Sequence, residues 1–227
     1  MKILVSIPTY DGKLQVEVVR CLLNEQLLAV QNGVDIQYRF LSNCSHAAMG
    51  RNQLASDFMN SDCDKMFFLD SDISFEPGSI VKLALFNVDI VGGAYRYKFE
   101  TENYPIGWLD KKELWSNEKG LIEVKSLPGG FLCISRKVFE AFQEAFPNRG
   151  YAHFDKESFG YFQMRFEDGM LWGEDSYFCK EWADLGGKVY LYPEIELTHW
   201  DFNRPFKGHI GNWLKARNEV SCPQSVI

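Results

Sequence analysis

The sequence lacks three features that would assign a protein quickly to a functional class. None of its six cysteines forms a Cys-x-x-Cys pair, Lys and Arg do not cluster, and no apolar run approaches the length of a membrane span. A disulfide framework and a cysteine-based zinc site are therefore not expected. Several cysteines lie in apolar runs, so we predict reduced, mostly buried thiols and a cytoplasmic protein, or one free in a host cytoplasm.

The charge balance argues against a further class. The chain has 24 Lys and Arg against 31 Asp and Glu, which gives a formal net charge of -7. Binding that depends on broad neutralisation of nucleic-acid phosphates is not expected from such a chain. A local basic pocket for a single pyrophosphate is still compatible with it. Aromatic residues make up 15% of the chain, which suits a ligand cleft, although core packing accounts for most of them.

Short apolar runs alternate with helical periodicities, and this order predicts an α/β fold. The predicted strands are 3–7, 35–41, 65–69, 89–91, 131–134 and 188–191. The predicted helices are 16–28, 49–59, a short segment ending at 86, 136–146 and 176–185. Such an order gives a mostly parallel central sheet with helices on both faces. No linker or repeat interrupts the chain, so we predict one Rossmann-like domain over residues 1–227.

Two of the predicted helices are amphipathic by the spacing of their apolar residues. In the first of them these residues are Val16, Val19, Leu22, Leu23 and Leu27. In the helix 136–146 they are Val138, Phe139, Phe142 and Phe146.

The sharpest motif is Asp70-Ser71-Asp72, which directly follows the apolar run 65–69. Its position predicts the carboxyl edge of the sheet, where open α/β folds bind ligands. Residues i and i+2 of an extended segment point the same way, so both carboxylates are expected to reach one site. Carboxylate oxygens suit Mg²⁺ or Mn²⁺, which would bridge a diphosphate.

Three interpretations compete for this motif. An Asp-Ser-Asp segment in a loop is often an Asx-turn or a helix cap. The same letters after a strand resemble the aspartyl nucleophile loop of haloacid-dehalogenase-like phosphatases, but those enzymes carry it on the first strand and here it follows the third. The third interpretation is the metal site of a glycosyltransferase.

Two further segments favour the third interpretation. Ser6-Ile7-Pro8-Thr9-Tyr10 ends the first strand, and Ala48-Met49-Gly50-Arg51-Asn52 lies in the second helix. With Asp70-Ser71-Asp72, they resemble the strand-one opening, the Ala-Arg-Asn helix and the Asp-x-Asp motif of the GT-A glycosyltransferases. The likeness is to family-2-like members, including compact viral or bacterial ones, and it spans roughly residues 1–200 by the spacing of motifs.

The resemblance implies a nucleotide-sugar donor and a divalent cation. Base and ribose would lie on the segment after strand one, a phosphate on the Arg51 fork, and the donor sugar over a glycine turn. The implied donor-site residues are Pro8, Thr9, Tyr10, Asp11, Arg51, Asn52, Asp70, Ser71, Gly129 and Gly130. The implied ligands of Mn²⁺ or Mg²⁺ are Asp70, Asp72 and His199. A surface helix charge for Arg51 and a plain tight turn at Gly129 are the alternatives.

One departure from the family concerns the base. Family-2 enzymes usually carry an acidic cluster with Gly-Ser after the second strand, and here the segment is Leu41-Ser42-Asn43-Cys44-Ser45-His46. Both UDP and GDP therefore stay open as the nucleotide.

Trp172-Gly173-Glu174-Asp175 precedes the helix 176–185 and resembles the Glu-Asp motif of inverting GT-A enzymes. The resemblance implies that Asp175 is the general base on the acceptor hydroxyl and that Glu174 orients a sugar hydroxyl. An N-cap with acidic first-turn residues would give the same letters. For His199, a surface or core histidine is the alternative to a ligand.

Together these features predict a metal-dependent, inverting glycosyltransferase that acts on a hydroxyl of a glycan, protein or modified nucleic acid. Residues of about 1–100 would form the donor and metal half, and 101–227 the acceptor half. A haloacid-dehalogenase-like phosphatase with Asp70 as nucleophile, and a catalytically silent carbohydrate-binding protein, are the alternatives. The aromatic residues that could form an acceptor wall, or equally the core, are Trp108, Trp115, Tyr151, Phe154 and Tyr161.

Overall fold

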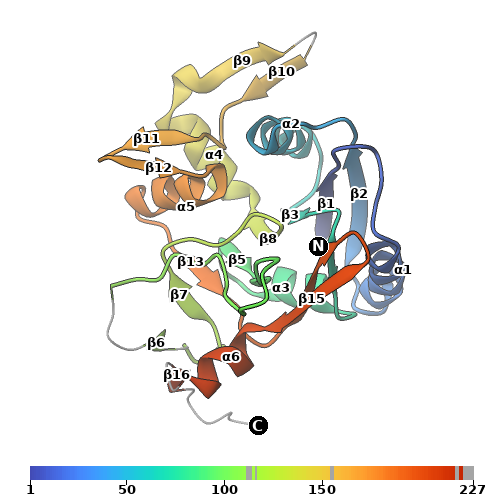
Figure 1. Cartoon of the computed structure of the whole chain (residues 1–227). Helices are drawn as coiled ribbons and strands as arrows, with labels where there is room; N and C mark the ends of the chain where they lie inside the picture. The colour runs from blue at the N-terminus through green and yellow to red at the C-terminus, as the bar shows by residue number, and fades with distance from the viewer. Residues whose placement is uncertain (111–113, 116, 154–155, 218–219, 222–227) are drawn as a thin grey trace.

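A seven-stranded sheet forms the centre of the molecule (Figure 1). The computed structural model describes residues 1–110, 114–115, 117–153, 156–217 and 220–221. Across the sheet the strands are β2 (Asp35–Leu41), β1 (Lys2–Pro8), β3 (Lys65–Leu69), β8 (Phe131–Ser135), β5 (Ile90–Gly92), β13 (Val189–Leu191) and β7 (Ile122–Val124). β8 and β7 are antiparallel to their neighbours, while the other strands run in one direction.

Helices cover both faces of this sheet. They are α1 (Val16–Gln31), α2 (Ala47–Met59), α3 (Ser79–Leu85), α4 (Arg136–Ala145), α5 (Glu174–Asp184) and α6 (Ile210–Ala216). Alternation along β3 explains the two layers, because successive side chains of a strand point to opposite faces. Phe68 packs in the core with α2, α4 and α5, whereas Phe67 packs in the core with α1 and α3.

Smaller sheets extend from the loops (Figure 1). A three-stranded sheet joins β15 (Arg204–His209), β14 (Glu196–Asp201) and β4 (Ile73–Phe75). Two hairpins pair β9 (Gly150–His153) with β10 (Lys156–Phe159), and β11 (Arg165–Glu167) with β12 (Met170–Trp172). The remaining elements are β6 (Leu114–Trp115), β16 (Val220–Ser221) and a 3-10 turn at Pro147–Arg149.

The predicted fold class is confirmed as a Rossmann-like α/β fold with a mainly parallel central sheet and helices on both faces. The first-half strands and helices lie close to their predicted bounds, and the helix Arg136–Ala145 buries Val138, Phe139 and Phe142 as expected. The sequence did not predict β4, the two hairpins or the pairing of β14 with β15. The division into a donor half and an acceptor half stays a prediction.

The predicted apolar stripe of α1 is wrong, although the helix itself is confirmed. Val16, Val19, Leu23 and Leu27 are exposed, and of the predicted positions only Leu22 is buried. The face on the sheet instead carries Val18, Glu25 and Ala29 with Leu22. Glu25 belongs there because its carboxylate accepts hydrogen bonds from the first turn of α3, from Gly78 N at 2.6 Å and from Val81 N at 2.8 Å.

The cysteines of the described residues are free thiols. Cys63, Cys133 and Cys179 are buried, and Cys21 and Cys44 are half-buried, while Cys222 lies outside the described residues. Burial raises the pKa of Cys133 and of Cys179 to about 12, which keeps both as unreactive thiols. Among the described residues, no helix is long and apolar enough to cross a membrane.

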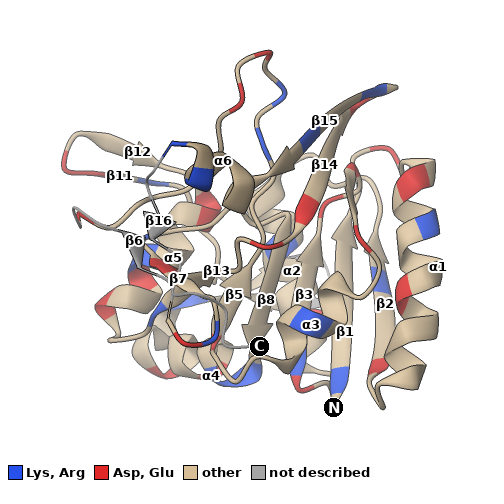
Figure 2. Ribbon diagram, turned by 90° about the horizontal axis from the view of Figure 1, so that it is seen from below, with Lys and Arg blue, Asp and Glu red and all other residues tan. Residues whose placement is uncertain are grey.

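Acidic and basic residues are interspersed along the described chain, and Figure 2 shows positions of both kinds on α1.

Candidate active site

The Asp70-Ser71-Asp72 motif forms a tight turn between β3 and β4 at the carboxyl edge of the sheet. Ile73 N donates to Asp70 O at 3.2 Å and closes the turn. Asp70 N donates to Gly130 O at 2.9 Å, which joins the turn to the loop before β8. The expectation of an extended segment is therefore wrong, since residues 71–72 form the turn. The carboxylates of Asp70 and Asp72 consequently contact different partners.

Arg51 is the partner of Asp70. Its Nη2 donates to Asp70 Oδ1 at 3.1 Å and its Nη1 donates to Gly129 O at 2.9 Å. A longer contact of 3.5 Å joins Nε to Glu174 Oε1. The guanidinium lies 5.2 Å from the ring centroid of Phe68, and the residue is only 4% exposed. Arg51 is therefore buried, and a surface helix charge is the wrong description of it.

The electrostatics of Arg51 follow from this burial. Desolvation alone would lower the pKa of its guanidinium, but Asp70, Tyr95, Glu174 and Asp175 raise that pKa above its ordinary value. The group is thus a permanent cation held among carboxylates.

Gly129 and Gly130 are required because charged side chains approach their backbone closely. A Cβ atom on Gly129 would lie 2.8 Å from Arg51 Cζ. A Cβ atom on Gly130 would lie 2.3 Å from Asp70 Oδ2 and 2.7 Å from Tyr95 Oη. The turn was predicted to bring backbone close to a donor sugar; here it already lets the protein's own ionic groups pack against it.

The Glu174-Asp175 motif begins α5, as predicted. Asp175 Oδ2 accepts from Gly129 N at 3.1 Å, and its Oδ1 accepts from Ser176 N at 2.7 Å. Because Gly129 O is bonded to Arg51, both sides of this glycine are occupied. The two acidic motifs, far apart in the sequence, therefore meet at Arg51 and Gly129.

A second cluster surrounds Asp72. Lys98 Nζ lies 2.7 Å from Asp72 Oδ2, and His199 Nε2 lies 3.5 Å from the same oxygen. Burial would raise the pKa of Asp72, but hydrogen bonds and charge from His199 and Lys98 outweigh it and lower that pKa. Antiparallel pairing of β14 with β4 sets His199 opposite Ile73, which explains its position beside the turn.

Tyr95 links the two clusters. Its hydroxyl lies 3.4 Å from Asp70 Oδ2, and its ring packs edge-on against His199 at 4.9 Å between centroids. Burial raises the pKa of Tyr95 well above its ordinary value, so the group stays a neutral phenol. Sequence reasoning missed Tyr95 and Lys98. The available signal was their place in a polar and aromatic segment directly after strand 90–92, at the same sheet edge.

The chemistry of the Asp72 cluster suits a divalent cation. His199 Nδ1 lies 3.0 Å from Arg96 O, a carbonyl that can only accept, so Nδ1 carries a hydrogen. Nε2 is then the ring nitrogen on the Asp72 side that could serve as a metal ligand, and a second-shell carbonyl at Nδ1 is typical of metal-bound histidine. The predicted ligands Asp70, Asp72 and His199 do not form one metal site in this structure. Among the described residues, no three or more His, Cys, Asp or Glu side chains are spaced to hold a metal ion.

The other predicted donor-site residues differ in their exposure and in whether other protein groups already occupy their polar atoms. Thr9 is buried, and both its N and Oγ1 donate to Leu41 O. Asn52 is buried as well and exchanges two hydrogen bonds with the backbone of Phe162, which makes it a structural clamp. Asp11 pairs with Lys13 at 2.6 Å in an exposed turn.

Three further predicted donor-site residues, Pro8, Tyr10 and Ser71, lie at the end of a strand or just after one at this edge of the sheet. Tyr10 is highly exposed, and Pro8 ends β1 half-buried. Ser71 contributes its carbonyl, which accepts from Gln15 N at 3.1 Å.

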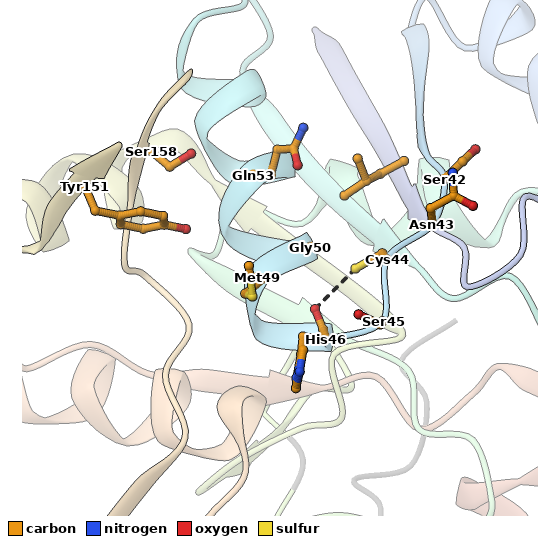
Figure 3. Close-up of a pocket in the computed structure, with 11 residues that line it drawn as sticks. Ser42, Asn43, Cys44, Ser45, His46, Met49, Gly50, Gln53, Tyr151 and Ser158 are labelled. Atoms are coloured by element: carbon orange, nitrogen blue, oxygen red, sulfur yellow. Dashed lines mark hydrogen bonds between the residues drawn. The ribbon is translucent and has the colours of Figure 1, made fainter. Parts of the chain in front are cut away.

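A cavity of about 180 Å³ opens beside the loop after β2 (Figure 3). Gly50, Met49 and Gln53 of α2 line one wall, and Tyr151 and Ser158 of the β9–β10 hairpin line another. The remaining lining residues are Leu41, Ser42, Asn43, Cys44, Ser45 and His46. None of the candidate carboxylates lines it. The cavity is therefore a neighbour of the ionic clusters and not part of them.

A second, more open cavity of about 280 Å³ lies next to the Glu-Asp motif. Gly173 and Ser176, which flank the motif, line it together with Trp172. Lys125 Nζ lies 5.2 Å from the centroid of the Trp172 ring. The other lining residues are Gly107, Ser126, Met170 and Leu171.

Of the aromatic residues considered for an acceptor wall, only Tyr151 lines a cavity described above. Tyr161 is fully buried in the core, and Trp108 packs against that core. Phe154 and the side chain of Trp115 lie outside the described residues.

No protein-family model and no curated protein sequence matches the chain. Solved structures do. A197 from STIV is 22% identical, with 90% of this chain and 88% of that chain covered and a TM-score of 0.56. The catalytic domain of Drosophila β1,4-galactosyltransferase 7 in complex with xylobiose is 14% identical over 100% of this chain and 76% of that chain, with a TM-score of 0.49. S. aureus TarS 1–349 in complex with UDP-GlcNAc is 12% identical over 100% and 60%, with a TM-score of 0.48.

The two transferases score below the level that establishes a shared fold. The likeness to A197 does reach that level, and at this identity it concerns architecture alone. This chain is therefore similar in fold to A197 from STIV, and its activity has to be argued from its own residues.

Proposed function

We propose that this protein is a glycosyltransferase that moves a sugar from a nucleotide-sugar donor to an acceptor hydroxyl. One observation carries the proposal. The Asp-Ser-Asp turn after β3 and the Glu-Asp start of α5 meet at one sheet edge through Arg51 and Gly129. Transfer of a sugar from a diphosphate needs a cation to compensate the charge of the leaving group and a base for the nucleophile. Carboxylates of the first motif would hold that cation, and a carboxylate of the second would be the base.

Asp175 is the proposed base. In the proposed reaction the acceptor O–H proton passes to the Asp175 carboxylate, the acceptor oxygen bonds to the anomeric carbon, and the bond from that carbon to the diphosphate oxygen breaks. A base on the face opposite the leaving group gives inversion. Asp175 lies in the first turn of α5, and the Gly129 N–H donates to one of its carboxylate oxygens. Glu174 is proposed to orient a sugar hydroxyl.

Asp72 and His199 are the proposed holders of Mn²⁺ or Mg²⁺, and Asp70 would join them only after a rearrangement of the turn. A bound cation would neutralise charge on the departing nucleoside diphosphate. The mixed oxygen and nitrogen donor set favours Mn²⁺ over Mg²⁺. UDP and GDP both stay open as the nucleotide.

The acceptor is proposed to lie in the open cavity beside Trp172, Gly173 and Ser176, next to the proposed base. Glycan, protein and modified nucleic acid remain its possible classes. A phosphatase with Asp70 as nucleophile is less well supported, since the motif follows the third strand, β3, and not the first. A cytoplasmic location is likewise a proposal, and it draws on the free thiols.

A thermal-shift screen tests this function. UDP-, GDP-, dTDP- and CMP-sugars are added with and without Mn²⁺, because a ligand that binds the folded state raises the melting temperature. We expect UDP- or GDP-sugars to raise it only when Mn²⁺ is present, and product analysis of that donor with simple glycosides to show inversion. No stabilisation by any donor, together with hydrolysis of p-nitrophenyl phosphate that is lost in Asp70→Asn, would replace this proposal with the phosphatase.

A further inference from the structure

Arg51 is committed to protein acceptors on every nitrogen of its guanidinium. Nη1, Nη2 and Nε contact Gly129 O, Asp70 Oδ1 and Glu174 Oε1 respectively. The side chain is almost fully buried and packs on the ring of Phe68. A phosphate ligand needs donors that face the ligand, and the Arg51 fork faces two carboxylates and a carbonyl instead.

Charge leads to the same conclusion. One guanidinium serves both Asp70 and Glu174, and Asp175 lies close to this group through Gly129. The cluster around Arg51 therefore has a surplus of negative charge. An anionic diphosphate gains little from a cation that is already shared among carboxylates.

Gly129 connects Arg51 to the proposed base. Its carbonyl accepts from Arg51 Nη1 at 2.9 Å and its N–H donates to Asp175 Oδ2 at 3.1 Å. The two peptide groups that flank the Gly129 Cα are each held by one hydrogen bond, so a change at Arg51 reaches Asp175 through the backbone of one residue. A Cβ atom on Gly129 would lie 2.8 Å from Arg51 Cζ, so only glycine allows this close packing.

We infer that Arg51 is a positioning residue, which fixes the Asp70 carboxylate on one side of the reaction site and the Glu174-Asp175 pair on the other, and that it does not bind the donor phosphate. The inference rests on the proposed function and departs from the role that the resemblance implies for this arginine. Displacements of about 1 Å in such a constellation cost rate on the order of a hundredfold.

The test compares Arg51→Met and Arg51→Lys with a matched control, Arg39→Met. Arg39 is an exposed arginine of β2 that pairs with Asp57 of α2 at 2.7 Å, so its loss removes an ion pair away from the site. UDP and GDP affinity in the presence of Mn²⁺ is measured by calorimetry, and kcat and KM by transfer from the donor that binds.

A positioning role predicts a kcat lowered about a hundredfold in Arg51→Met with nucleotide affinity within about threefold of wild type. Arg51→Lys keeps the charge but loses the fork, so it recovers part of the lost kcat. A nucleotide Kd and a donor KM that rise together while kcat is kept would instead make Arg51 a phosphate ligand and overturn the inference.

Amide hydrogen exchange at Gly129 separates this inference from the proposed function, because it needs neither donor nor activity. We expect exchange at Gly129 to quicken about tenfold in Arg51→Met, the scale of one lost hydrogen bond, and to stay unchanged in Arg39→Met. If Arg51→Met does not fold, Arg51→Lys carries the same measurement with a smaller effect. An unchanged Gly129 amide in a folded Arg51 variant refutes the positioning role, whether or not the wild-type protein transfers sugar.

Discussion

Lys98 Nζ lies 2.7 Å from Asp72 Oδ2, on the same oxygen that faces His199 Nε2 at 3.5 Å. A cation of the protein thus stands beside the pair that we propose for Mn²⁺. Lys98 and the metal ion would compete for the Asp72 carboxylate, because either cation would compensate its negative charge.

The first prediction follows from this competition. Lys98→Met should bind Mn²⁺ about tenfold more tightly than wild type, the scale of one charge-assisted hydrogen bond. Calorimetric titration with MnCl₂ measures it. Lys13→Met is the matched control, because Lys13 pairs with Asp11 in an exposed turn. Weaker Mn²⁺ binding in Lys98→Met would mean that the lysine helps to build the site.

Loss of either proposed metal ligand should abolish the metal dependence of nucleotide binding. We expect Asp72→Ala and His199→Ala to fold, to bind Mn²⁺ at least about tenfold more weakly and to lose the stabilisation by nucleotide with Mn²⁺. Asp57→Ala, which removes a surface carboxylate of α2, should change none of these. Full Mn²⁺ affinity in His199→Ala would remove the histidine from the metal site.

Asp175 should matter for rate and not for donor binding. Asp175→Asn keeps the contact with Gly129 N but removes the basic carboxylate, so kcat should fall roughly a hundredfold while donor affinity is kept. Glu174→Gln should affect KM at least as much as kcat. Asp184→Asn, at the exposed end of the same helix, is the control. A near-normal kcat in Asp175→Asn, or a product of retained configuration, contradicts the assignment.

Gly130→Ala should damage the site through shape alone. Its Cβ would lie 2.3 Å from Asp70 Oδ2, so the carboxylate and Tyr95 must move. We expect a loss of about 1–3 kcal/mol in the free energy of unfolding, measured in urea, and weaker nucleotide binding. Gly150→Ala is the control, since nothing lies within 4 Å of its added atom, and it should stay within ~0.5 kcal/mol of wild type. Equal stability of the two variants would contradict the packing described for Asp70.

The buried Glu25 gives a prediction for pH. Burial raises the pKa of Glu25 above its ordinary value of 4.5, although hydrogen bonds from the α3 backbone oppose the shift. A carboxyl group with a raised pKa binds more protons in the folded state, so its stabilising contribution is full below the unfolded pKa and is lost as the pH rises through the folded pKa. The free energy of unfolding of wild type minus that of Glu25→Gln should therefore fall as the pH rises from about 4.5. If this difference in the free energy of unfolding increased with pH over this window, the prediction would be contradicted.

The sequence predicted best what depends on local pattern. The apolar run 65–69 could only be a buried strand, and the acidic pair after it marked the sheet edge. Arg51, Asp175 and His199 were found because they stand in recognisable motifs, and the structure brings all three to this edge. Their contacts were beyond the sequence, because they join segments far apart in the chain.

The failures have physical causes. The apolar stripe predicted for α1 was wrong because Glu25 is buried on that helix, where its carboxylate caps α3. The spacing of apolar residues cannot predict a buried acidic residue. Asp70 and Asp72 separate because β4 begins at Ile73 and forces a turn between them. Lys98 and Tyr95 have no motif of their own, and their roles appear only once β5 is set beside β8.

The pairing of β14 with β4 has a consequence for synthesis of the protein. His199 reaches Asp72 only through that antiparallel register, so a ribosome has made most of the chain before the last ligand exists. The central strands can associate earlier, with Asp72 and Lys98 already present as partners. Because contacts of long sequence separation form slowly, capture of the proposed metal would be one of the final events of maturation. Until then the lysine holds the carboxylate, so that the nascent chain does not present an unpaired anion at its open edge.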